Sequence, residues 1–511
     1  MQAAEHIKQR FNSRSDGSPV LGLVVMATAA AVTVLLVLGF SGAFESYPYL
    51  YLVPWLLGLA AVMAIPNVIL YYKGQFSFAN PVIFATFSYF FPAFVIGGIF
   101  FAGGWAQPYF VQLIQDADYN LPLTIVMVGL AFAGLSVGYM LPTGGKLGRF
   151  LSERLPLANY EPRSFVIPGL LLLSLGVLNT VIAFALGLFG YQKGDEINSY
   201  DGIVYLTTLF WMQGSFLLWL VIFRQRSIKL AYVPIMALLA ITSLSKAVFA
   251  GNRGSVVQIF AVVALAYILS GRKFSFKQGA IAGIILSVGL MIGMIYGTTF
   301  RHVKGTESQQ SVGQYTENVL HTFDQVGKND TWESIQFGFS SLTERVDMLS
   351  TLAVVVSNYE QLAPYEEAYG IDNNIWIETT TFFIPRVIWT EKPSVSDARR
   401  FSDLYFNFDE SSFGITVVGD LLRNFGIIGI PLGMFVLGLI LRVIYDALIN
   451  GHPMVIWRQT VYFMLLTTVS YEGFYGTIIP GLFKVGLTAA VGIAMVTLIA
   501  KKADRSGDLR G

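Results

Sequence analysis

Long apolar stretches alternate with short polar connections along most of the chain, and this pattern predicts a bundle of membrane-spanning helices. About twelve stretches have the length expected of a transmembrane helix. They lie near residues 19–40, 51–72, 81–102, 121–141, 164–189, 204–223, 229–247, 255–270, 279–300, 418–445, 459–477 and 481–500. The predicted fold class is therefore an all-α polytopic membrane protein with about 12 transmembrane helices.

Basic residues in the connections predict the topology. Most Lys and Arg lie in alternate connections, as the positive-inside rule requires of cytoplasmic loops. These residues are Lys73, Lys146, Arg149, Arg154, Arg163, Arg224, Arg226, Lys229, Arg272, Lys273, Lys277, Lys501, Lys502 and Arg505. The opposite loops 41–49 and 103–120 carry no Lys or Arg. An even number of spans then places both termini in the cytoplasm.

The same pattern divides the chain into five parts. The first apolar stretch exceeds the roughly 7–15 apolar residues of a signal peptide, so we expect an uncleaved helix. The predicted parts are a cytoplasmic N-terminal tail (1–18), nine transmembrane helices (19–300), a large periplasmic loop (301–412), three further helices (413–500) and a cytoplasmic tail (501–511). The loop is far longer than most connections, which indicates a functional element.

Two parts of this loop have a pattern of their own. Residues 342–358 are apolar near helical spacing, which predicts a short amphipathic helix lying against the membrane. Residues 376–389 are apolar and aromatic but too short to span. We expect this second segment to enter the membrane interface or to pack against the outer ends of the helices.

Composition agrees with a membrane protein and excludes several other classes. Of 511 residues, 54% are hydrophobic and 13% are charged, a balance that no soluble domain of this length carries. A net charge of +1 gives no basic field for nucleic acid. The absence of cysteine excludes disulfides and thiolate metal sites. No Walker loop, dinucleotide fingerprint or zinc-ligand spacing occurs.

A group of cations falls on or near the outer face, where the positive-inside rule does not place them. The group consists of Lys246, Arg253, Arg386, Lys392, Arg399, Arg400, Arg423 and Lys484. An anionic ligand such as a lipid pyrophosphate explains them most economically. We predict that five of them line one outward-opening cavity near the interface, namely Lys246, Arg253, Arg386, Lys392 and Arg423.

Two sequence segments hold four of these cations, Lys246 with Arg253 and Arg386 with Lys392. In the turn after Lys246, glycines flank Asn252 and Arg253. Backbone amides and the guanidinium could therefore bind phosphate oxygens. The alternative is an ordinary turn whose Arg reaches lipid headgroups. In 384–393, two prolines present Arg386 and Lys392 beside Trp389, which could stack on a sugar. The alternative there is an interfacial anchor, and Arg399 and Arg400 could equally be solvated.

Two further motifs add carboxylates. Asp420 and Arg423 are three residues apart, so they share a helical face and could act in the site or form a structural ion pair. Glu472 and Lys484 lie at facing ends of the last two predicted spans, where they could form a salt bridge or flank a cavity. Glu472 could accept a proton from an acceptor hydroxyl, although a structural pairing is equally consistent.

The order of these motifs resembles the Wzy-type oligosaccharide repeat-unit polymerases of bacterial surface polysaccharide. The resemblance covers roughly 240–480 and rests on Gly251-Asn252-Arg253-Gly254, on Pro385 to Trp389 with Lys392-Pro393, and on Gly419 to Gly426 with Gly429. It implies a GT-C-like glycosyltransferase of the bacterial inner (plasma) membrane, acting on the periplasmic face without metal or nucleotide.

The resemblance also implies a substrate, protein partners and functional residues. The substrate would be undecaprenyl-pyrophosphate-linked oligosaccharide, polymerised into O-antigen or exopolysaccharide, and a flippase and a chain-length regulator are the expected protein partners. By position, Arg253, Arg386 and Arg423 would be the functional arginines, assisted by Lys392. Asp420 replaces what is often a glutamate in the family, and no general base is assigned.

Three alternatives stay open. An O-antigen ligase-like transferase would use the same donor, and His302 and His321 could serve it. A lipid-linked oligosaccharide flippase or other transporter would be expected to show repeat symmetry and broken helices in both halves. A metal-dependent enzyme would need an acidic pair, and Asp116 with Asp118 offers one. We predict that no cofactor is needed, because arginines can stabilise a pyrophosphate leaving group without a metal.

Overall fold

The fold was analysed in a computed structural model of the chain. It describes residues 49–106, 108–156, 160–186, 188, 201–225, 229–250, 253–272, 276–304, 312–328, 331–408, 412–452 and 454–508. These residues form helices and contain no β-strand. Within them, nine helices are long and apolar enough to cross a membrane. The prediction of an all-helical multi-pass membrane protein is thus confirmed for these ranges, whereas the span expected at 19–40 lies outside them.

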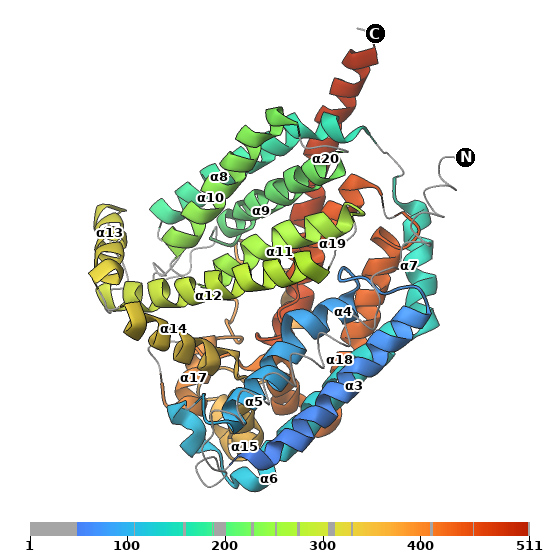
Figure 1. Cartoon of the computed structure of the whole chain (residues 1–511). Helices are drawn as coiled ribbons and strands as arrows, with labels where there is room; N and C mark the ends of the chain where they lie inside the picture. The colour runs from blue at the N-terminus through green and yellow to red at the C-terminus, as the bar shows by residue number, and fades with distance from the viewer. Residues whose placement is uncertain are drawn as a thin grey trace.

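The helices follow one another in chain order from blue to red in Figure 1. The main elements are α3 (Val53–Tyr72), α4 (Pro81–Ala85), the π-helical segment η3 (Thr86–Ile96), α5 (Gly97–Ala102), α6 (Ala117–Met140), α7 (Pro142–Arg154), α8 (Val166–Ala185), α9 (Asp201–Arg224), α10 (Val233–Ala250), α11 (Arg253–Leu269), α12 (Phe276–Lys304), α13 (Val312–Lys328), α14 (Thr331–Val346), α15 (Leu349–Glu366), α16 (Asn374–Thr381), α17 (Ala398–Phe406), α18 (Thr416–Leu448), α19 (Ile456–Thr468) and α20 (Ile478–Asp508). The short 3₁₀ turns η5 (Pro162–Phe165) and η7 (Tyr475–Thr477) precede α8 and α20.

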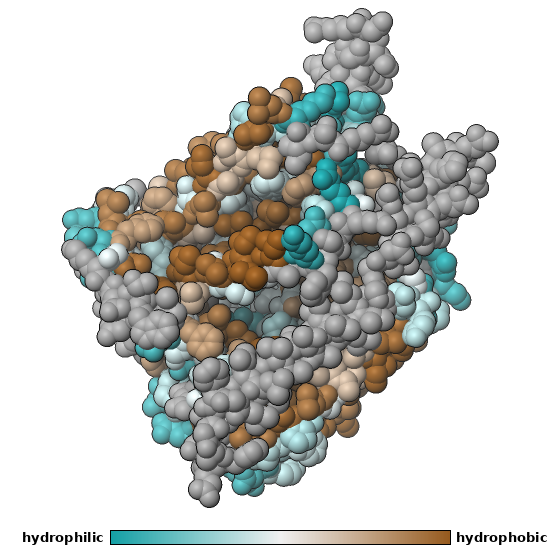
Figure 2. All heavy atoms as spheres, in the orientation of Figure 1, coloured by the Kyte–Doolittle hydropathy of each residue, from teal (hydrophilic) through white to brown (hydrophobic). Residues whose placement is uncertain are grey.

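Two large hydrophobic clusters form the interior. One joins α3, η3, α6, α15 and α18 from Val417 to Leu441. The other joins α8, α9, α11, α19 and α20. In Figure 1, α3, α6 and α18 accordingly run along one side of the molecule, and α8, α9 and α10 form the other side. Apolar side chains also gather on the outward surface over α11 and α12, as expected of helices that face lipid (Figure 2).

Glycines allow α6 and α18 to pack closely along their length. A methyl group at Gly138 would overlap the backbone carbonyl of Phe435, and one at Gly438 would overlap the carbonyl of Leu135. Small residues at such positions let two helix backbones approach, which is the usual means of helix association in a membrane. The contact fixes α18, and therefore the motif at its start.

α18 is interrupted at Gly426, the last residue of the motif that begins at Gly419. Gly426 has φ 66° and ψ −170°, a conformation that is essentially restricted to glycine. The side chain of Leu421 touches Gly433, although these residues would be ~18 Å apart in a straight helix. The segment 416–425 therefore folds back against the rest of α18.

The long loop folds differently from the sequence expectation. Residues 342–358 do not form one surface helix, because α14 ends at Val346 and α15 begins at Leu349. Every residue from Leu349 to Val356 is buried, and a helix that is apolar on all sides belongs in the interior. A methyl group at Gly97 would overlap the backbone at Val346, so the junction inserts deeply against α5.

The expected span at 459–477 is also different. Its helix α19 has 13 residues and ends at Thr468, which is too short to cross a membrane alone. The chain that follows is irregular, and the amides of Thr416 and Val417 donate to the carbonyls of Glu472 and Tyr471 at 3.0 Å each. The irregular chain after α19 thus lies against the start of α18.

Candidate functional site

Asp420 and Arg423 form a buried ion pair, as their spacing predicted. Arg423 Nη2 lies 3.0 Å from Asp420 Oδ1, and both side chains are 0% exposed. The guanidinium also donates to the Ile371 carbonyl at 3.1 Å. The pair lies in the folded-back segment of α18, which holds it inside the protein rather than toward lipid.

A second carboxylate, from the end of α15, completes the charge balance. Glu366 Oε1 lies 2.9 Å from Arg423 Nη1 and accepts a hydrogen bond from the Tyr405 hydroxyl at 2.8 Å. Burial raises the pKa of Glu366 above its ordinary value, although the Arg423 guanidinium opposes this shift. One guanidinium between two carboxylates has no net positive charge left to offer a pyrophosphate.

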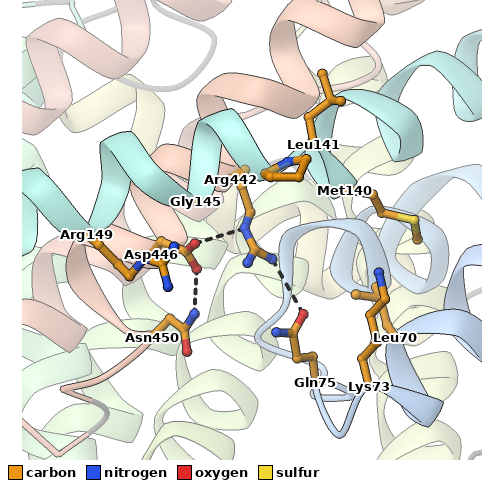
Figure 3. A pocket seen from close by; sticks show the side chains of 11 residues that line it. Leu70, Lys73, Gln75, Met140, Leu141, Gly145, Arg149, Arg442, Asp446 and Asn450 are labelled. Carbon is orange, nitrogen blue, oxygen red and sulfur yellow. Dashed lines mark hydrogen bonds and ion pairs between the residues drawn. The ribbon is translucent and has the colours of Figure 1, made fainter.

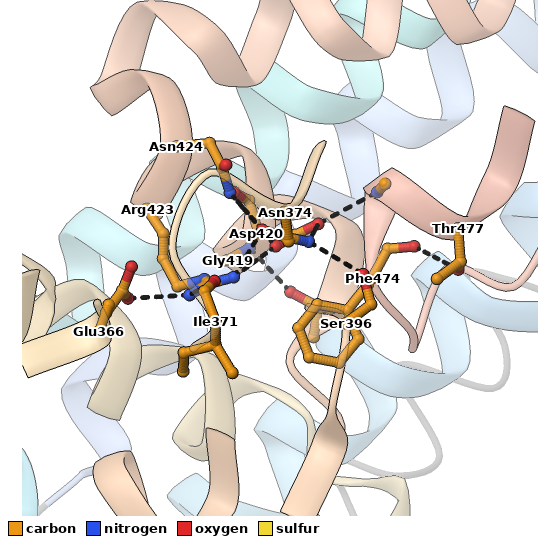
Figure 4. Close-up of polar contacts among 12 residues, drawn as sticks. Glu366, Ile371, Asn374, Ser396, Gly419, Asp420, Arg423, Asn424, Phe474 and Thr477 are labelled. Carbon is orange, nitrogen blue, oxygen red and sulfur yellow. Dashed lines mark hydrogen bonds and ion pairs between the residues drawn. The ribbon is translucent and has the colours of Figure 1, made fainter. Parts of the chain in front are cut away.

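Asn374, the first residue of α16, connects the elements of this network (Figure 4). Its Oδ1 accepts from Arg423 Nη2 at 2.7 Å and from Asn424 Nδ2 at 2.8 Å. Its Nδ2 donates to Asp420 Oδ2 at 3.1 Å, and the Gly476 amide donates to the same oxygen at 3.2 Å. We call Glu366, Asn374, Asp420, Arg423 and Asn424 the polar knot. It ties α15, α16, α18 and η7 together.

A cluster of cations lies beside the polar knot, around Glu378 of α16. Burial raises the pKa of the Glu378 carboxyl above its ordinary value. Three cations oppose the shift electrostatically, in the order Lys484, Lys392 and Arg386. We call these four residues the Glu378 cluster. Residues about 100 positions apart in the chain are thus brought within electrostatic reach of one carboxylate.

The three cations of the Glu378 cluster differ in their partners. Lys392 is 9% exposed, and its ammonium donates to the carbonyls of Thr381 at 2.7 Å and Ile384 at 3.3 Å. Burial, and next the charge of Lys484, lower the pKa of Lys392. Arg386 and Lys484, by contrast, have no side-chain hydrogen bond or ion pair with any residue that the structure describes. These two cations are available to a ligand, whereas the Lys392 ammonium is used by carbonyl groups at and just beyond the C-terminal end of α16.

Aromatic side chains surround this cluster. Phe382 packs against Phe483 with ring centroids 5.0 Å apart, which joins the segment after α16 to α20. Trp376 and Phe383 remain 68% and 63% exposed, and Trp389 is 37% exposed. The segment 376–389 therefore packs against a helix end on one side and presents aromatic surface on the other.

Glu472 has a different partner from the expected one. Its carboxylate forms an ion pair with Arg345 at the end of α14, and Lys484 lies instead near Glu378. The Glu472–Lys484 salt bridge, one of the two alternatives that the sequence offered for these residues, is therefore not formed. The physical reason is the short α19, because the irregular chain after Thr468 turns Glu472 toward α14. A carboxylate held by Arg345 is a less available proton acceptor than Glu378.

The remaining sequence candidates do not all join this group. The Lys246 ammonium lies 3.9 Å above the Trp211 ring, inside the other hydrophobic cluster. Arg400 donates to the Tyr369 carbonyl at 3.3 Å, and Arg399 is exposed at the start of α17. Asn252 and the side chain of Arg253 lie outside the described residues, so the convergence of Arg253 with Arg386 stays a prediction.

Sequence reasoning missed Glu366, Asn374 and Glu378. A single carboxylate inside the apolar run 375–384 was a usable signal for Glu378. Glu366 has a second glutamate beside it and Asn374 a second asparagine, so nothing in the sequence separates either residue from its neighbour. Asp116 and Asp118 are exposed at the start of α6. In the described ranges, no three His, Asp or Glu side chains are grouped as metal ligands.

Comparison with known proteins gives no match, whether with protein-family models, with characterised proteins or with solved structures. The function must therefore be inferred from the residues and their geometry.

Proposed function

We propose that this protein is an inner-membrane glycosyltransferase that polymerises undecaprenyl-pyrophosphate-linked oligosaccharide repeat units on the periplasmic face. The proposal includes a GT-C-like bundle of about 12 spans with both termini in the cytoplasm. The observation that supports it most is that Arg386 and Lys484, two cations with no hydrogen bond or ion pair to a described residue, lie within electrostatic reach of the half-buried Glu378.

The two available cations suit the chemistry of the donor. A glycosyl pyrophosphate needs its developing negative charge stabilised when the glycosidic bond to phosphate breaks. The planar Arg386 guanidinium can hold two phosphate oxygens at once, and the Lys484 ammonium can add a second positive charge. Exposed aromatic rings at Trp376 and Trp389 offer flat apolar surfaces on which a sugar ring can stack.

Glu378 is the candidate proton acceptor. The acceptor hydroxyl must lose a proton as it attacks the anomeric carbon, and a carboxylate with a raised pKa is a better base than an exposed one. Activity should then rise as the pH increases through the raised pKa of Glu378, because the carboxylate is the active form. The polar knot next to it would act as a scaffold that positions α16.

The test uses the purified full chain with an undecaprenyl-pyrophosphate-linked repeat unit and follows polymer length. Removing the bidentate contact in Arg386→Gln should cost about 2–4 kcal/mol of barrier, or roughly 30- to 1,000-fold in rate. Arg386→Lys should remain well below wild type, because the fork is lost although the charge is kept. Arg399→Gln is the matched control, since it removes an exposed cation from the same loop.

The Glu378→Gln variant tests the base separately. It should abolish elongation while binding of the lipid-linked donor persists. If Arg386→Gln and Glu378→Gln both elongate like the Arg399→Gln control, the site is misplaced. A deletion strain separates polymerase from ligase, because a single-repeat glycan indicates a polymerase and unattached polymer indicates a ligase.

Lipid-linked oligosaccharide transport is the second candidate, and the interrupted helices favour it. A break at Gly426 and a π-helical segment in η3 resemble the discontinuous helices of transporters, although no repeat is evident. The cysteine-free chain allows a clean test with Val355→Cys and Gly419→Cys, whose side chains would meet between α15 and α18. Oxidation should leave elongation intact in a fixed catalytic site and should stop a transport cycle that needs this contact to open.

A further inference from the structure

A cavity of about 310 Å³ opens at the C-terminal end of α18, far along that helix from the polar knot. None of the residues considered above as catalytic or substrate-binding lines it. Its walls come from the end of α3, the junction of α6 with α7, and the last turns of α18 (Figure 3). The distribution of basic residues predicts that this end faces the cytoplasm.

Arg442 and Asp446 of α18 form the base of this cavity. Arg442 Nε lies 2.9 Å from Asp446 Oδ2, and Asp446 Oδ1 accepts from Asn450 Nδ2 at 2.8 Å. Arg442 Nη1 reaches Gln75 Oε1 at 3.5 Å across the cavity. The Asp446 carboxylate is therefore occupied on both oxygens, and the Arg442 guanidinium points toward Gln75, as Figure 3 shows.

Two exposed cations complete the lining. Lys73 follows α3, and Arg149 lies on α7. Neither side chain has a hydrogen bond or ion pair with a residue that the structure describes. Three cations against one carboxylate leave an excess of two positive charges around the cavity. Such an excess, with no partner of its own, suits an anionic group of charge near −2 or −1.

The packing of α7 against α18 builds this geometry. A methyl group at Gly148 would lie 2.6 Å from Asp446 Cβ, and one at Gly145 would lie 2.8 Å from Asp446 Oδ2. α7 begins at Pro142 without a side-chain cap and without an acidic residue in its first turn. The partial positive charge of its N-terminus therefore adds to the field of the three cations.

The other wall of the cavity is apolar, with Leu70, Met140 and Leu141. Tyr72 and Phe150, the sequence neighbours of Lys73 and Arg149, are 83% and 47% exposed. A cationic pocket with an apolar side, placed at the end of a transmembrane helix, matches a molecule with a phosphate head and a hydrocarbon tail.

We propose that this cavity is a binding site for a phosphate group, supplied by the headgroup of an anionic phospholipid. Arg442 holds the phosphate from below, Lys73 and Arg149 close over it, and the acyl chains lie along α3 and α6. A free phosphate would use the same cations but would gain nothing from the apolar wall. The site is independent of the proposed polymerase activity.

The test measures lipid retention by the purified full chain in detergent, with native mass spectrometry and titration by phosphatidylglycerol. The double variant Lys73→Gln, Arg149→Gln removes both exposed cations and should weaken phosphatidylglycerol binding at least about tenfold. The matched control is Lys146→Gln, Arg163→Gln, which removes two exposed positive charges from the same predicted face outside the cavity. It should bind like the wild type.

Further titrations identify the source of the phosphate. Selective binding of phosphatidylglycerol over zwitterionic phosphatidylcholine, lost only in the cavity variant, supports the lipid assignment. Binding of inorganic phosphate with the same dependence on Lys73 and Arg149, but without any preference for lipid, would keep the phosphate site and replace its source. Equal phosphatidylglycerol binding by both double variants, or equal loss in both, would overturn the proposal.

Discussion

The two arginines of the candidate site should respond oppositely to the same substitution. Arg423 is 0% exposed and contacts Glu366, Asp420 and the Ile371 carbonyl at 2.9–3.1 Å. Arg423→Gln would leave two carboxylates buried without their cation. Removing one partner of a buried ion pair typically costs about 3–5 kcal/mol. Arg386 has no hydrogen bond or ion pair with a described residue, so Arg386→Gln should change stability by no more than about 0.5 kcal/mol.

The assay is unfolding of the detergent-solubilised full chain, followed by tryptophan fluorescence in denaturant. Arg423→Gln should lower the free energy of unfolding, and adding Glu366→Gln should recover part of the loss, because only one uncompensated carboxylate then remains. A coupling of about 1–3 kcal/mol between the two substitutions is expected for groups in direct contact. Arg386→Gln should unfold like the wild type.

The elongation assay should give the reverse order once protein amounts are matched. Arg386→Gln should lose turnover in a folded protein, whereas any loss in Arg423→Gln should follow the fraction that is folded. Wild-type stability of Arg423→Gln would show that Arg423 does not hold the two carboxylates in place. A fully folded Arg423→Gln variant without turnover would show that Arg423 contacts substrate, and either result refutes a structural role for this arginine.

Three further outcomes follow from single positions. Burial raises the pKa of Asp347 to about 7, so the folded protein holds its proton more tightly than the unfolded chain does, and stability should fall as the pH rises from about 4 to about 7. Asp347→Asn should flatten the profile of unfolding midpoint against pH, and parallel profiles would contradict this. Gly426→Ala should lower the free energy of unfolding by about 1–3 kcal/mol through backbone strain alone, since no atom lies within 4 Å of the new methyl group. The control is Gly58→Ala inside α3, which should be neutral or slightly stabilising in the same unfolding assay. Asp116→Asn should retain elongation in EDTA, because Asn also adopts the left-handed backbone at φ 40°; loss of activity that Mg²⁺ restores would favour the metal-dependent alternative.

The helices were predictable where hydrophobicity alone determines them. Apolar length predicted all nine candidate spans among the described residues. The stretch predicted at 255–270 corresponds to a shorter apolar helix, Gly254–Leu269. The failure at 459–477 has a local cause. Hydropathy averages over a window and cannot detect that residues 469–474 give up helical hydrogen bonds to pair with the start of α18.

The site was predictable only for contacts close in sequence. Asp420 and Arg423 are one helical turn apart, so their pairing follows from the periodicity of the helix. The pairing of Arg423 with Glu366 depends on where α15 lies, and the sequence suggested a surface helix there. Because α15 was expected at the surface, Glu366 was not considered as a partner of Arg423, and the arginine was interpreted as a cation available to substrate.

The two interrupted segments explain how a polar site can exist at this depth in the protein. Irregular backbone within a membrane must have its amides and carbonyls satisfied by protein or by water. Here the irregular chain after α19 and the first turns of α18 satisfy each other: the amides of Thr416 and Val417 donate to the carbonyls of residues 472 and 471, and the Gly476 amide donates to the Asp420 carboxylate. Because the Gly476 amide joins η7 to α18, and Asn374 joins α18 to α16, the segment that carries Glu378 and Arg386 is attached to the buried interior at its first residue. A loop anchored in this way can present cations at the interface in a fixed position, which is what stabilisation of a leaving pyrophosphate requires.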